Sequence, residues 1–427
     1  MHITLPAAAA QPLPVAGASL RVAMVTETWP PEVNGVAATA ARVVQGLRAR
    51  GHLISLVRPR QESDGDGFHG QRLGQLAAGE LEQTLVRSLP VPRYPELRMG
   101  LPATHLLLQR WQAQRPDVVH VVTEGPLGWS AVRAARALGL PVVSDFRTNF
   151  PAYSRHYGAA WLYRPIMAHL RRLHNRTACT MVPTEALKSE LAAQGFQRLQ
   201  VVARGVDTQR FDPAHRSAAL RARWGAGPHT TVALCVGRLA PEKNLGLLVD
   251  AYEAMRLHDP QLLLVLVGDG PLREGLQARY PQLVFAGVQQ GAALAAHYAS
   301  ADVFLFPSVT ETYGNVVPEA MASGLAVLAY DHAAASLLLR HGHSGLLARC
   351  DDRGEFLRVA VGLAGDVKRM RALGQQARVV ALQHGWERIV AQVEARYADA
   401  LLRQPAGSPT GSGLTPAARP QARAGAG

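Results

Sequence analysis

The sequence predicts an α/β fold of two doubly wound, parallel-sheet domains that face each other. Short apolar runs alternate with amphipathic helical stretches in both halves of the chain, an order that is typical of parallel sheets covered by helices. The length of 427 residues suits two domains of ordinary size. Hydrophobic residues make up 48% of the chain, so two large cores can be buried.

The composition narrows the classes of partner. The formal net charge of +13 suits nucleic acid, a phospholipid surface or a phosphorylated substrate. Neither a zinc-finger spacing nor an aromatic RNA-binding signature occurs, so we expect no nucleic-acid partner. No apolar run approaches the roughly 20 residues that span a bilayer. The three cysteines, Cys179, Cys235 and Cys350, have no metal-ligand spacing and fit a reducing cytoplasm.

The first domain is predicted over residues 20–205. A disordered leader is expected before it at 1–19, because this stretch contains no Lys or Arg and is interrupted by proline. The first helix is expected to begin near Gly35 and to end at Gly51. The apolar runs of this half predict strands at 21–26, 53–57, 117–122, 141–144 and 178–182.

Two stretches of this half have competing interpretations. Asp64-Gly65-Asp66 has the spacing of an Asp-x-Asp metal-ligand pair, but no apolar strand leads directly into it, so an exposed turn is predicted. The stretch 159–176 has apolar residues at helical spacing. It fits either an interfacial membrane helix or a core-packed helix with a solvated basic face. Its arginines are Arg164, Arg171, Arg172 and Arg176.

The second domain is predicted over residues 206–385. Proline and glycine at 211–228 suggest a linker at its start. Helices are expected to run to about Leu402, the last of them over 386–403, and the tail at 404–427 is rich in Pro, Gly, Ser and Ala and is expected to be disordered. A helix is predicted at 244–255, and strands are predicted at 231–237, 262–267, 284–286, 303–306 and 326–330.

The stretch 301–331 carries the clearest signal for a site. A buried strand leads into a loop rich in Ser and Thr, and a helix opens after Gly314 and Asn315. Glu311 in the loop and Glu319 in the helix have seven residues between them. Two hydroxyl-binding carboxylates beside amides that attract anions suit a sugar attached to a phosphate. The alternative for Glu319 is a residue that the helix dipole favours in a first turn.

A second motif, GRLAPEKN, follows a strand that ends at Gly237. Arg238 is expected at the carboxyl end of this strand, and Lys243 just before the next helix. Two cations there suit a diphosphate, because Arg can bind it bidentately and Lys adds a point charge. The alternative for either cation is an ion pair with Glu242.

The first domain carries weaker motifs. Gly35, in the segment PEVNGV, stands at a helix start where the backbone can approach a phosphate or an acceptor closely. A tight turn into the helix is the alternative reason for this glycine. The segments EGPLG at 124–128 and RGVD at 204–207 also stand between predicted elements. No G-x-G-x-x-G fingerprint follows the first strand, which argues against an NAD enzyme.

Together these motifs resemble the retaining nucleotide-sugar glycosyltransferases of family four, which have the two-domain GT-B architecture. The Glu-x(7)-Glu pair, the G-R-x(4)-K element and the P-x-x-N-G-V segment all match without a gap, and the resemblance runs over about residues 21–397. Further segments resemble the bacterial GDP-mannose-dependent α-mannosyltransferases that act on lipid acceptors. These are RYPELR at 93–98, TNF at 148–150, Tyr153 and Tyr157-Gly158.

The resemblance implies transfer of a hexose, with retention, from a nucleotide diphosphate sugar to an acceptor hydroxyl. GDP-mannose is the expected donor, and a glycolipid or lipid headgroup is the expected acceptor. The second domain is expected to hold the donor and the first the acceptor, and the helix at 386–403 is expected to cross back to the first domain. No metal and no cofactor besides the nucleotide-sugar co-substrate are implied.

The resemblance also assigns roles to site residues. Arg238 and Lys243 are expected to bind the donor diphosphate, Glu311 the sugar hydroxyls and Glu319 the ribose. The departing phosphate is expected to take the acceptor proton. Further donor contacts are expected from Gly35, Gly237, Tyr313, Gly314, Asn315 and Val316.

Arg147 departs from the family pattern, in which a histidine precedes Thr in this segment. Arginine cannot act as a base at neutral pH, so no proton-relay role passes to it. We expect Arg147 to bind the donor phosphate or an acidic acceptor headgroup. The alternative is a structural ion pair with Asp145.

Two other functions stay open on the sequence alone. A nucleotide-sugar epimerase has the same architecture and needs no acceptor, and a non-catalytic protein could bind a nucleotide sugar as a sensor. We expect a cytoplasmic protein. Peripheral contact with the inner face of an anionic membrane depends on which interpretation of the helix at 159–176 holds.

Overall fold

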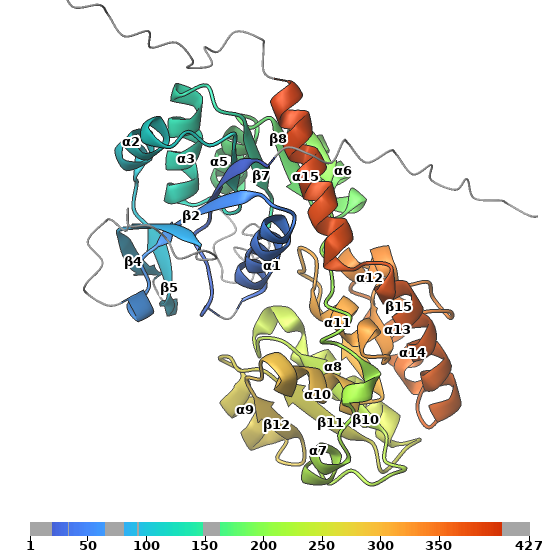
Figure 1. Cartoon of the computed structure of the whole chain (residues 1–427). Coiled ribbons are helices and arrows are strands. Elements are labelled where there is room, and N and C mark those ends of the chain that lie inside the picture. Colours follow the sequence, from blue (N-terminus) through green and yellow to red (C-terminus); the bar gives the residue numbers. More distant parts are fainter. Residues whose placement is uncertain (1–18, 33, 65–80, 92–93, 148–162, 404–427) are drawn as a thin grey trace, which may run out of the picture.

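The computed structural model describes residues 19–32, 34–64, 81–91, 94–147 and 163–403. Within these ranges the chain forms two parallel β-sheets, each covered by helices (Figure 1). The first sheet is built from the N-terminal half and the second from most of the remainder. The predicted class of two doubly wound α/β domains is therefore confirmed.

The first sheet has seven parallel strands in the order β3-β2-β1-β6-β7-β8-β9. The central strands are buried on both faces, which explains why they appear in the sequence as continuous apolar runs. The edge strands β3 and β9 were not predicted, since β3 is polar and β9 is very short. The strands are β1 (Arg21–Val25), β2 (Leu53–Pro59), β3 (Glu82–Val86), β6 (Val118–Val121), β7 (Val142–Asp145), β8 (Cys179–Val182) and β9 (Leu199–Val201).

Helices and one hairpin complete the first domain. Asn34 caps the first helix, because its side-chain oxygen accepts hydrogen bonds from the amides of Val36 and Ala37 at 3.1 and 2.8 Å. The antiparallel hairpin of β4 (Ser88–Val91) and β5 (Tyr94–Gly100) was not predicted. The helices are α1 (Gly35–Ala49), α2 (Thr104–Ala113), α3 (Pro126–Ala137), α5 (Tyr163–His174) and α6 (Glu185–Ala193).

The second sheet has six parallel strands in the order β12-β11-β10-β13-β14-β15. Side chains of β10 alternate between two cores, with Val232, Leu234 and Val236 on one face and Ala233 and Cys235 on the other. Cys235 is thus a packing residue. The strands are β10 (Val232–Val236), β11 (Leu263–Val267), β12 (Val284–Gly287), β13 (Val303–Phe306), β14 (Ala326–Tyr330) and β15 (Leu346–Ala348).

The helices of the second domain cover both faces of this sheet. Two short 3-10 helices, Pro213–His215 and Pro241–Lys243, precede α7 and α8. The α-helices are α7 (Ala218–Arg223), α8 (Leu245–Arg256), α9 (Arg273–Arg279), α10 (Gly291–Ser300), α11 (Val316–Ala322), α12 (Ala333–Leu338), α13 (Arg353–Val361) and α14 (Val367–Leu382).

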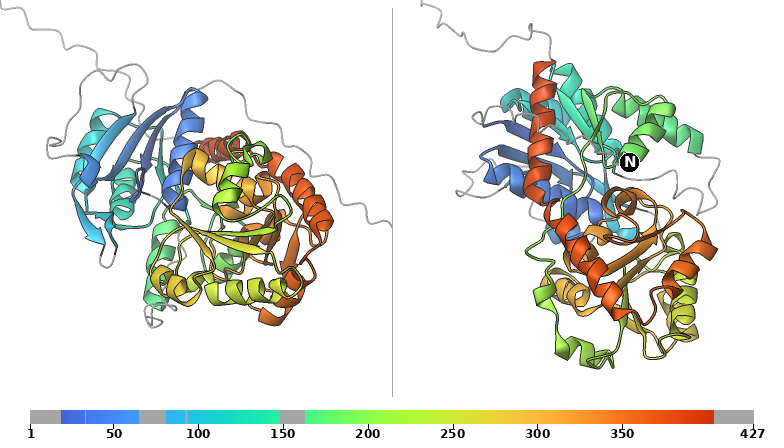
Figure 2. Two further views of the ribbon diagram at one scale, coloured as in Figure 1. Left: turned by 90° about the horizontal axis from the view of Figure 1, so that it is seen from below. Right: turned by 90° about the vertical axis from the view of Figure 1, so that its right-hand side faces the viewer.

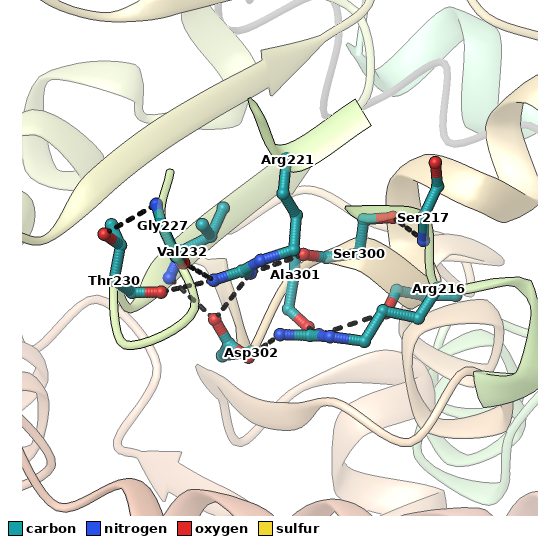
Figure 3. Close-up of polar contacts among 10 residues, drawn as sticks. Arg216, Ser217, Arg221, Gly227, Thr230, Val232, Ser300, Ala301 and Asp302 are labelled. Carbon is teal, nitrogen blue, oxygen red and sulfur yellow. Dashed lines mark hydrogen bonds and ion pairs between the residues drawn. The ribbon is translucent and has the colours of Figure 1, made fainter. Parts of the chain in front are cut away.

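The prediction of a linker at 211–228 is wrong. The segment contains α7, and the arginines of this segment bind it to the second domain through ion pairs and hydrogen bonds (Figure 3). Asp302, next to the start of β13, forms ion pairs with Arg216 and Arg221 at 2.8 and 3.1 Å. The proline and glycine of this segment shape short turns between packed pieces, and they do not mark an extended connection.

The last helix, α15 (Trp386–Leu402), lies along the first domain although it follows the second in sequence (Figure 2). Its Val390, Val393 and Tyr397 belong to the same core as residues of α1 and β1. A Cβ atom on Gly46 of α1 would meet Val390 Cγ2 at 2.4 Å, so the glycine permits the two helices to pack closely. The chain therefore crosses between the domains twice.

Candidate functional site

The two strongest motifs lie side by side because β10 and β13 are parallel neighbours. Their carboxyl ends meet at one edge of the second sheet, the edge where open α/β sheets bind ligands. The GRLAPEKN segment leaves β10 there, and the loop that holds Glu311 leaves β13. The structure thus brings together residues that are about seventy positions apart in sequence.

Lys243 and Glu311 form an ion pair at this edge. Their side chains are 18% and 15% exposed. Ser308 Oγ donates a hydrogen bond to the same carboxylate at 2.7 Å. Burial by itself raises the pKa of Glu311, but Lys243 and then Ser308 outweigh it and hold the pKa below the usual glutamate value. Glu311 is therefore ionised at neutral pH and can accept hydrogen bonds from hydroxyl groups.

Glu319 lies in the first turn of α11 and has a different environment. Tyr298, which is fully buried, donates its hydroxyl to Glu319 Oε2 at 2.9 Å. Burial raises the pKa of Glu319 to about 7. The dipole of α11 alone would lower the pKa of a glutamate in the first turn of this helix. Sequence reasoning missed Tyr298, because the contact joins α10 to α11 and no motif spans both.

Arg238 follows β10 and contacts the buried carboxylate of Glu242. This is the ion pair that the sequence left open as an alternative. The side chain of Arg238 is 34% exposed, so part of it faces solvent. Glu242 Oε2 has no hydrogen-bond partner in the described part of the chain. The pair holds Arg238 at the strand end, where it can still bind a ligand.

Close packing of backbone surrounds Arg238. Gly237 has φ +150°, and a Cβ atom on Gly268 would meet the Gly237 carbonyl oxygen at 1.9 Å. A Cβ atom on Gly270 would meet the carbonyl oxygen of Leu239 at 2.5 Å. Sequence reasoning did not single out Gly268 or Gly270, although the pair directly follows a predicted strand as GDG. These glycines let the loops after β10 and β11 lie against each other.

The loop before α11 is held from several sides. Gly314 has φ +86°, a conformation that glycine adopts at little cost. The hydroxyl of Tyr313, which is buried, donates to the carbonyl of Arg204 at 3.1 Å. His332 contacts the carbonyl of Glu311 through Nε2 at 3.2 Å. Val316, which begins α11, lies next to these residues.

Asn315 connects the two domains. Its Nδ2 lies 3.4 Å from the carbonyl oxygen of Gly35 and 3.5 Å from Thr39 Oγ1 on α1. A Cβ atom on Gly35 would approach Asn315 Nδ2 to 3.2 Å. Gly35 therefore lies against the loop that precedes α11. The close approach of Asn315 leaves little room for a side chain at this position, which gives a reason for glycine there.

Arg147 follows β7 and forms an ion pair with Asp145 at 2.5 Å, as the structural alternative for this residue proposed. Desolvation by itself raises the pKa of Asp145, but Arg147 and then His120 outweigh it and lower the pKa to about 2. His120 continues the chain of contacts to the hydroxyl of Tyr397 on α15 at 2.7 Å. Arg147 is 9% exposed.

The predicted turn at Asp64 is a short 3-10 helix, Glu62–Asp64. Asp64 is paired with Arg58 at 2.7 Å and accepts the amide of Gln61 at 2.7 Å, so its carboxylate is engaged and not freely exposed. Asp66 lies outside the described residues. Within the described ranges, no group of three or more His, Cys, Asp or Glu side chains is placed to hold a metal ion.

The basic helix α5 packs its apolar side on the first domain. Met167, Leu170 and Leu173 are buried, whereas Arg164 and Arg172 are exposed. The core-packed interpretation therefore holds for the apolar face. In the part of the chain that the structure describes, no helix is long and apolar enough to cross a membrane.

Several predicted features fall outside the described residues. The leader up to residue 18, the tail from 404, and the segments TNF at 148–150, Tyr153 and Tyr157-Gly158 are among them. The same holds for Arg93 in the RYPELR segment.

Comparison with known proteins agrees with this geometry. The model described as Glycosyltransferase Family 4 matches residues 33–210, and the model described as Glycosyl transferases group 1 matches residues 230–383. The chain is 36% identical over 381 residues to a GDP-mannose-dependent alpha-mannosyltransferase of Mycobacterium tuberculosis, covering 88% of this chain and 96% of that protein. It is 34% identical over 391 residues to a protein of the same description from Mycolicibacterium smegmatis, covering 90% and 99%.

A solved structure supports the fold. Sucrose-phosphate synthase from Thermosynechococcus elongatus superposes with a TM-score of 0.71 at 18% identity, covering 90% of this chain and 99% of that one. This likeness concerns the two-domain GT-B architecture alone. The sequence matches do not favour an epimerase or a protein that only binds a nucleotide sugar. The chain is a glycosyltransferase that belongs to glycosyltransferase family 4.

Proposed function

We propose that the protein transfers mannose from GDP-mannose to a hydroxyl group of a glycolipid or lipid headgroup, with retention at the anomeric carbon. The observation that carries this proposal is that Arg238, Lys243 and Glu311 lie in loops at the carboxyl ends of β10 and β13, where Lys243 contacts Glu311, and that Glu319 lies in α11, the helix that follows the second loop. This edge combines two cations for a diphosphate with two carboxylates for hydroxyl groups. The identity of the donor is supported by the extent of the match to the two mycobacterial mannosyltransferases.

The domains divide the two substrates in this proposal. The second domain, residues 206–385, binds the nucleotide sugar through its motif loops. The first domain, residues 20–205, together with the helix at 386–403, forms the acceptor side. The contact between Asn315 and Gly35 supports this division, because it sets the donor loop against the start of α1.

The chemical task is to expel a diphosphate. Negative charge develops on the leaving oxygen, and fixed cations nearby stabilise it. Arg238 and Lys243 would bind the diphosphate, with backbone amides near Gly314, Asn315 and Val316 as further donors. Binding of the diphosphate draws Lys243 away from its full interaction with Glu311, which leaves that carboxylate for the hydroxyl groups of the sugar.

The remaining roles follow from the environments of the residues. Glu319, held by Tyr298, accepts the ribose hydroxyls. By analogy with the family, the departing phosphate takes the acceptor proton. Arg147 replaces the histidine of the family pattern and cannot act as a base. Gly237 and Gly35 allow backbone to approach the donor closely, and Tyr313 anchors the loop through its hydrogen bond to the carbonyl of Arg204. No step in this scheme needs a metal ion.

A lipid acceptor would bring the protein to a membrane surface. The exposed arginines of α5 lie on the first domain, which is the acceptor side in this proposal. Arginines near an anionic surface attract it electrostatically. We propose peripheral contact on the cytoplasmic face through this helix.

A panel of nucleotide sugars tests the donor, first by thermal shift and then by turnover with a lipid extract. We expect GDP-mannose to raise the melting temperature most and to yield a mannosylated lipid. Activity should survive EDTA, and restoration specifically by Mg²⁺ or Mn²⁺ would contradict the cation-based scheme. Release of a changed nucleotide sugar without any acceptor would instead identify an epimerase.

A further inference from the structure

Arg204 is a buried arginine with incomplete hydrogen bonding. It lies in the segment that joins the two sheets and is 7% exposed. Its Nη1 reaches Asn315 Oδ1 at 3.4 Å, and its guanidinium carbon lies 5.6 Å from the centre of the Tyr313 ring. Its Nη2 has no hydrogen-bond partner in the described part of the chain. A buried charged group with an unmade hydrogen bond is costly, so this arrangement requires a reason.

A small cavity adjoins Arg204 at the junction of the domains. Its volume is about 20 Å³, and Arg147, Asp145 and Thr39 also line it. Asp145 already pairs with Arg147 and contacts His120. Among the residues that line this cavity, one carboxylate stands beside two guanidinium groups, so positive charge is in excess.

Arg204 keeps its charge in this position. Burial, followed by the neighbouring Arg147, lowers the pKa of Arg204 to about 10. The group is still protonated at neutral pH. Besides Asp145, the carboxylate of Glu311 acts electrostatically on Arg204, and that carboxylate is paired with Lys243.

Arg221 shows what a structural arginine of equal burial looks like in this protein. It is 5% exposed. Figure 3 shows its guanidinium group surrounded by acceptors, with Ser300 O at 2.8 Å, Asp302 Oδ2 at 3.1 Å and Gly227 O at 3.2 Å. A further bond goes to the carbonyl of Thr230 at 2.5 Å. In the folded protein the guanidinium group of Arg221 is thus hydrogen-bonded on several sides, whereas Nη2 of Arg204 has no hydrogen-bond partner among the described residues.

We propose that Arg204 and Arg147 form an oxyanion subsite that a substrate completes. A cavity of this size admits roughly one oxygen atom, so a single phosphate or carboxylate oxygen enters and accepts a hydrogen bond from Arg204 Nη2. The rest of the substrate lies outside the cavity. The inference rests on the proposed transfer reaction, because the oxyanion belongs to one of its substrates.

The subsite is separate from the pair of cations at the end of β10. Arg238 and Lys243 belong to the second domain, whereas Arg147 and Arg204 belong to the first domain, Arg204 at its end where the chain crosses to the second. The oxyanion has two sources, the donor phosphate or an acidic group on the acceptor. Both present the same chemistry to a guanidinium group, and binding experiments distinguish them.

The first test measures the stability of the free protein. Arg204→Gln removes an unsatisfied buried charge, so we expect the melting temperature to stay within about 2 °C of the wild type or to rise. Arg221→Gln is the matched control and should lower the melting temperature by about 4 °C or more, because it breaks satisfied bonds. A fall for Arg204→Gln equal to that of Arg221→Gln would overturn the proposal, since Arg204 would then be structural.

The second test identifies the source of the oxyanion. Isothermal titration gives the Kd of GDP for the wild type, Arg204→Gln and Arg147→Gln, and turnover is measured on lipid fractions separated by anion exchange into neutral and anionic lipids. A Kd for GDP at least tenfold weaker in the variants assigns the donor phosphate. An unchanged Kd with a tenfold loss on anionic lipids alone assigns the acceptor. Changes below threefold in both measurements would overturn the subsite.

The two hypotheses fail in different ways. If the wild type turns over no combination of nucleotide sugar and lipid, the proposed function is wrong. The subsite is then judged by titration with inorganic phosphate at constant ionic strength. Weaker phosphate binding in Arg204→Gln than in the wild type supports it, and equal binding rejects it. Arg204→Lys should restore part of the affinity lost in Arg204→Gln, because it returns the charge without the planar geometry.

Discussion

Lys243 has two potential partners in the proposed reaction, Glu311 in the free protein and a diphosphate in the complex. The ion pair stays within reach of a ligand, because both side chains retain some contact with solvent. It also keeps two groups in place that would otherwise move before the donor arrives. Such preorganisation is effective in catalysis, because the charges need not be reoriented during the reaction.

Removing either cation should therefore reduce catalysis strongly. We expect Lys243→Ala and Arg238→Ala each to lower kcat/KM by roughly 10²–10³, equivalent to about 3–4 kcal/mol of transition-state stabilisation. Lys188→Ala is a suitable control, because Lys188 lies on the first domain and forms a surface pair with the exposed Glu185. Steady-state kinetics on folded variants measures this. A loss under threefold in either variant would make that residue a surface cation.

Glu319 offers a prediction about pH. Burial raises its pKa from 4.5 to about 7, so the folded state binds a proton more tightly than the unfolded state. Its contribution to stability is complete below about pH 4.5 and is lost as the pH rises through 7. Glu319→Gln keeps a neutral acceptor for Tyr298, so the substitution should be nearly neutral at pH 5 and stabilising by roughly 1–3 kcal/mol at pH 8. Urea unfolding at both pH values measures this. The same effect at pH 5 and pH 8 would show that Glu319 has an ordinary pKa.

At the scale of residues, the sequence predicted the motifs but not the tertiary contacts that set the charge state and position of their side chains. Arg238, Lys243 and Glu311 were recognisable because they occupy fixed positions beside strands. The pairing of Lys243 with Glu311 and the contact of Tyr298 with Glu319 join residues from different elements. Such contacts depend on how helices pack over the sheet, and the spacing of residues along the sequence does not predict this packing.

Helix α5 illustrates the same limit for an element. Its periodicity predicted an amphipathic helix, which is present, but periodicity does not state what the apolar face contacts. That face packs against a core that includes Phe146, Leu191 and Phe196. Membrane contact through α5 would therefore depend on charge and not on insertion of apolar side chains.

Charge-dependent contact predicts a dependence on salt. We expect the protein to bind anionic vesicles at low salt and to dissociate at high salt, since each arginine near the surface contributes about 1 kcal/mol and is screened by ions. Arg164→Glu combined with Arg172→Glu should weaken binding. The control, Lys368→Glu with Arg371→Glu on α14, changes the net charge equally and should bind as the wild type does. Vesicle flotation measures this, and equal partition into neutral and anionic vesicles would exclude an electrostatic contact.

The segment at 211–228 shows why some element boundaries could not be predicted. Proline and glycine break periodicity whether a chain is extended or packed in short turns. Arg216 and Arg221 of this segment form ion pairs with Asp302, which lies about eighty residues later in the sequence. The edge strands β3, β9 and β15 were missed for a related reason: they are short or polar, and pairing with a neighbour defines them more than their own composition does.

At the scale of the molecule, two crossings of the chain join the domains. One runs from β9 through Arg204 to Val206, and the other runs from α14 into α15. They touch each other, because the amide of Val206 donates to the carbonyl of His384 at 3.0 Å and Val206 pairs with Gly385 as an isolated parallel bridge. Arg42 of α1 adds an ion pair with Asp207 at 2.5 Å. The relative position of the domains thus depends on a small region next to the proposed oxyanion subsite.

Gly205 is the tightest point of that region. Its Cβ position lies 2.8 Å from Trp386 Cδ2 and 2.9 Å from Trp386 Cα, although the backbone is not in a glycine-only conformation. Gly205→Ala should therefore push the crossings apart, and overpacking of this kind costs about 1–3 kcal/mol. Gly246→Ala on α8 is the control, because nothing lies within 4 Å of its Cβ position and alanine favours helix. Urea unfolding measures stability, and small-angle X-ray scattering measures domain separation. If Gly205→Ala matches Gly246→Ala in both measurements, the two crossings do not fix the arrangement of the domains.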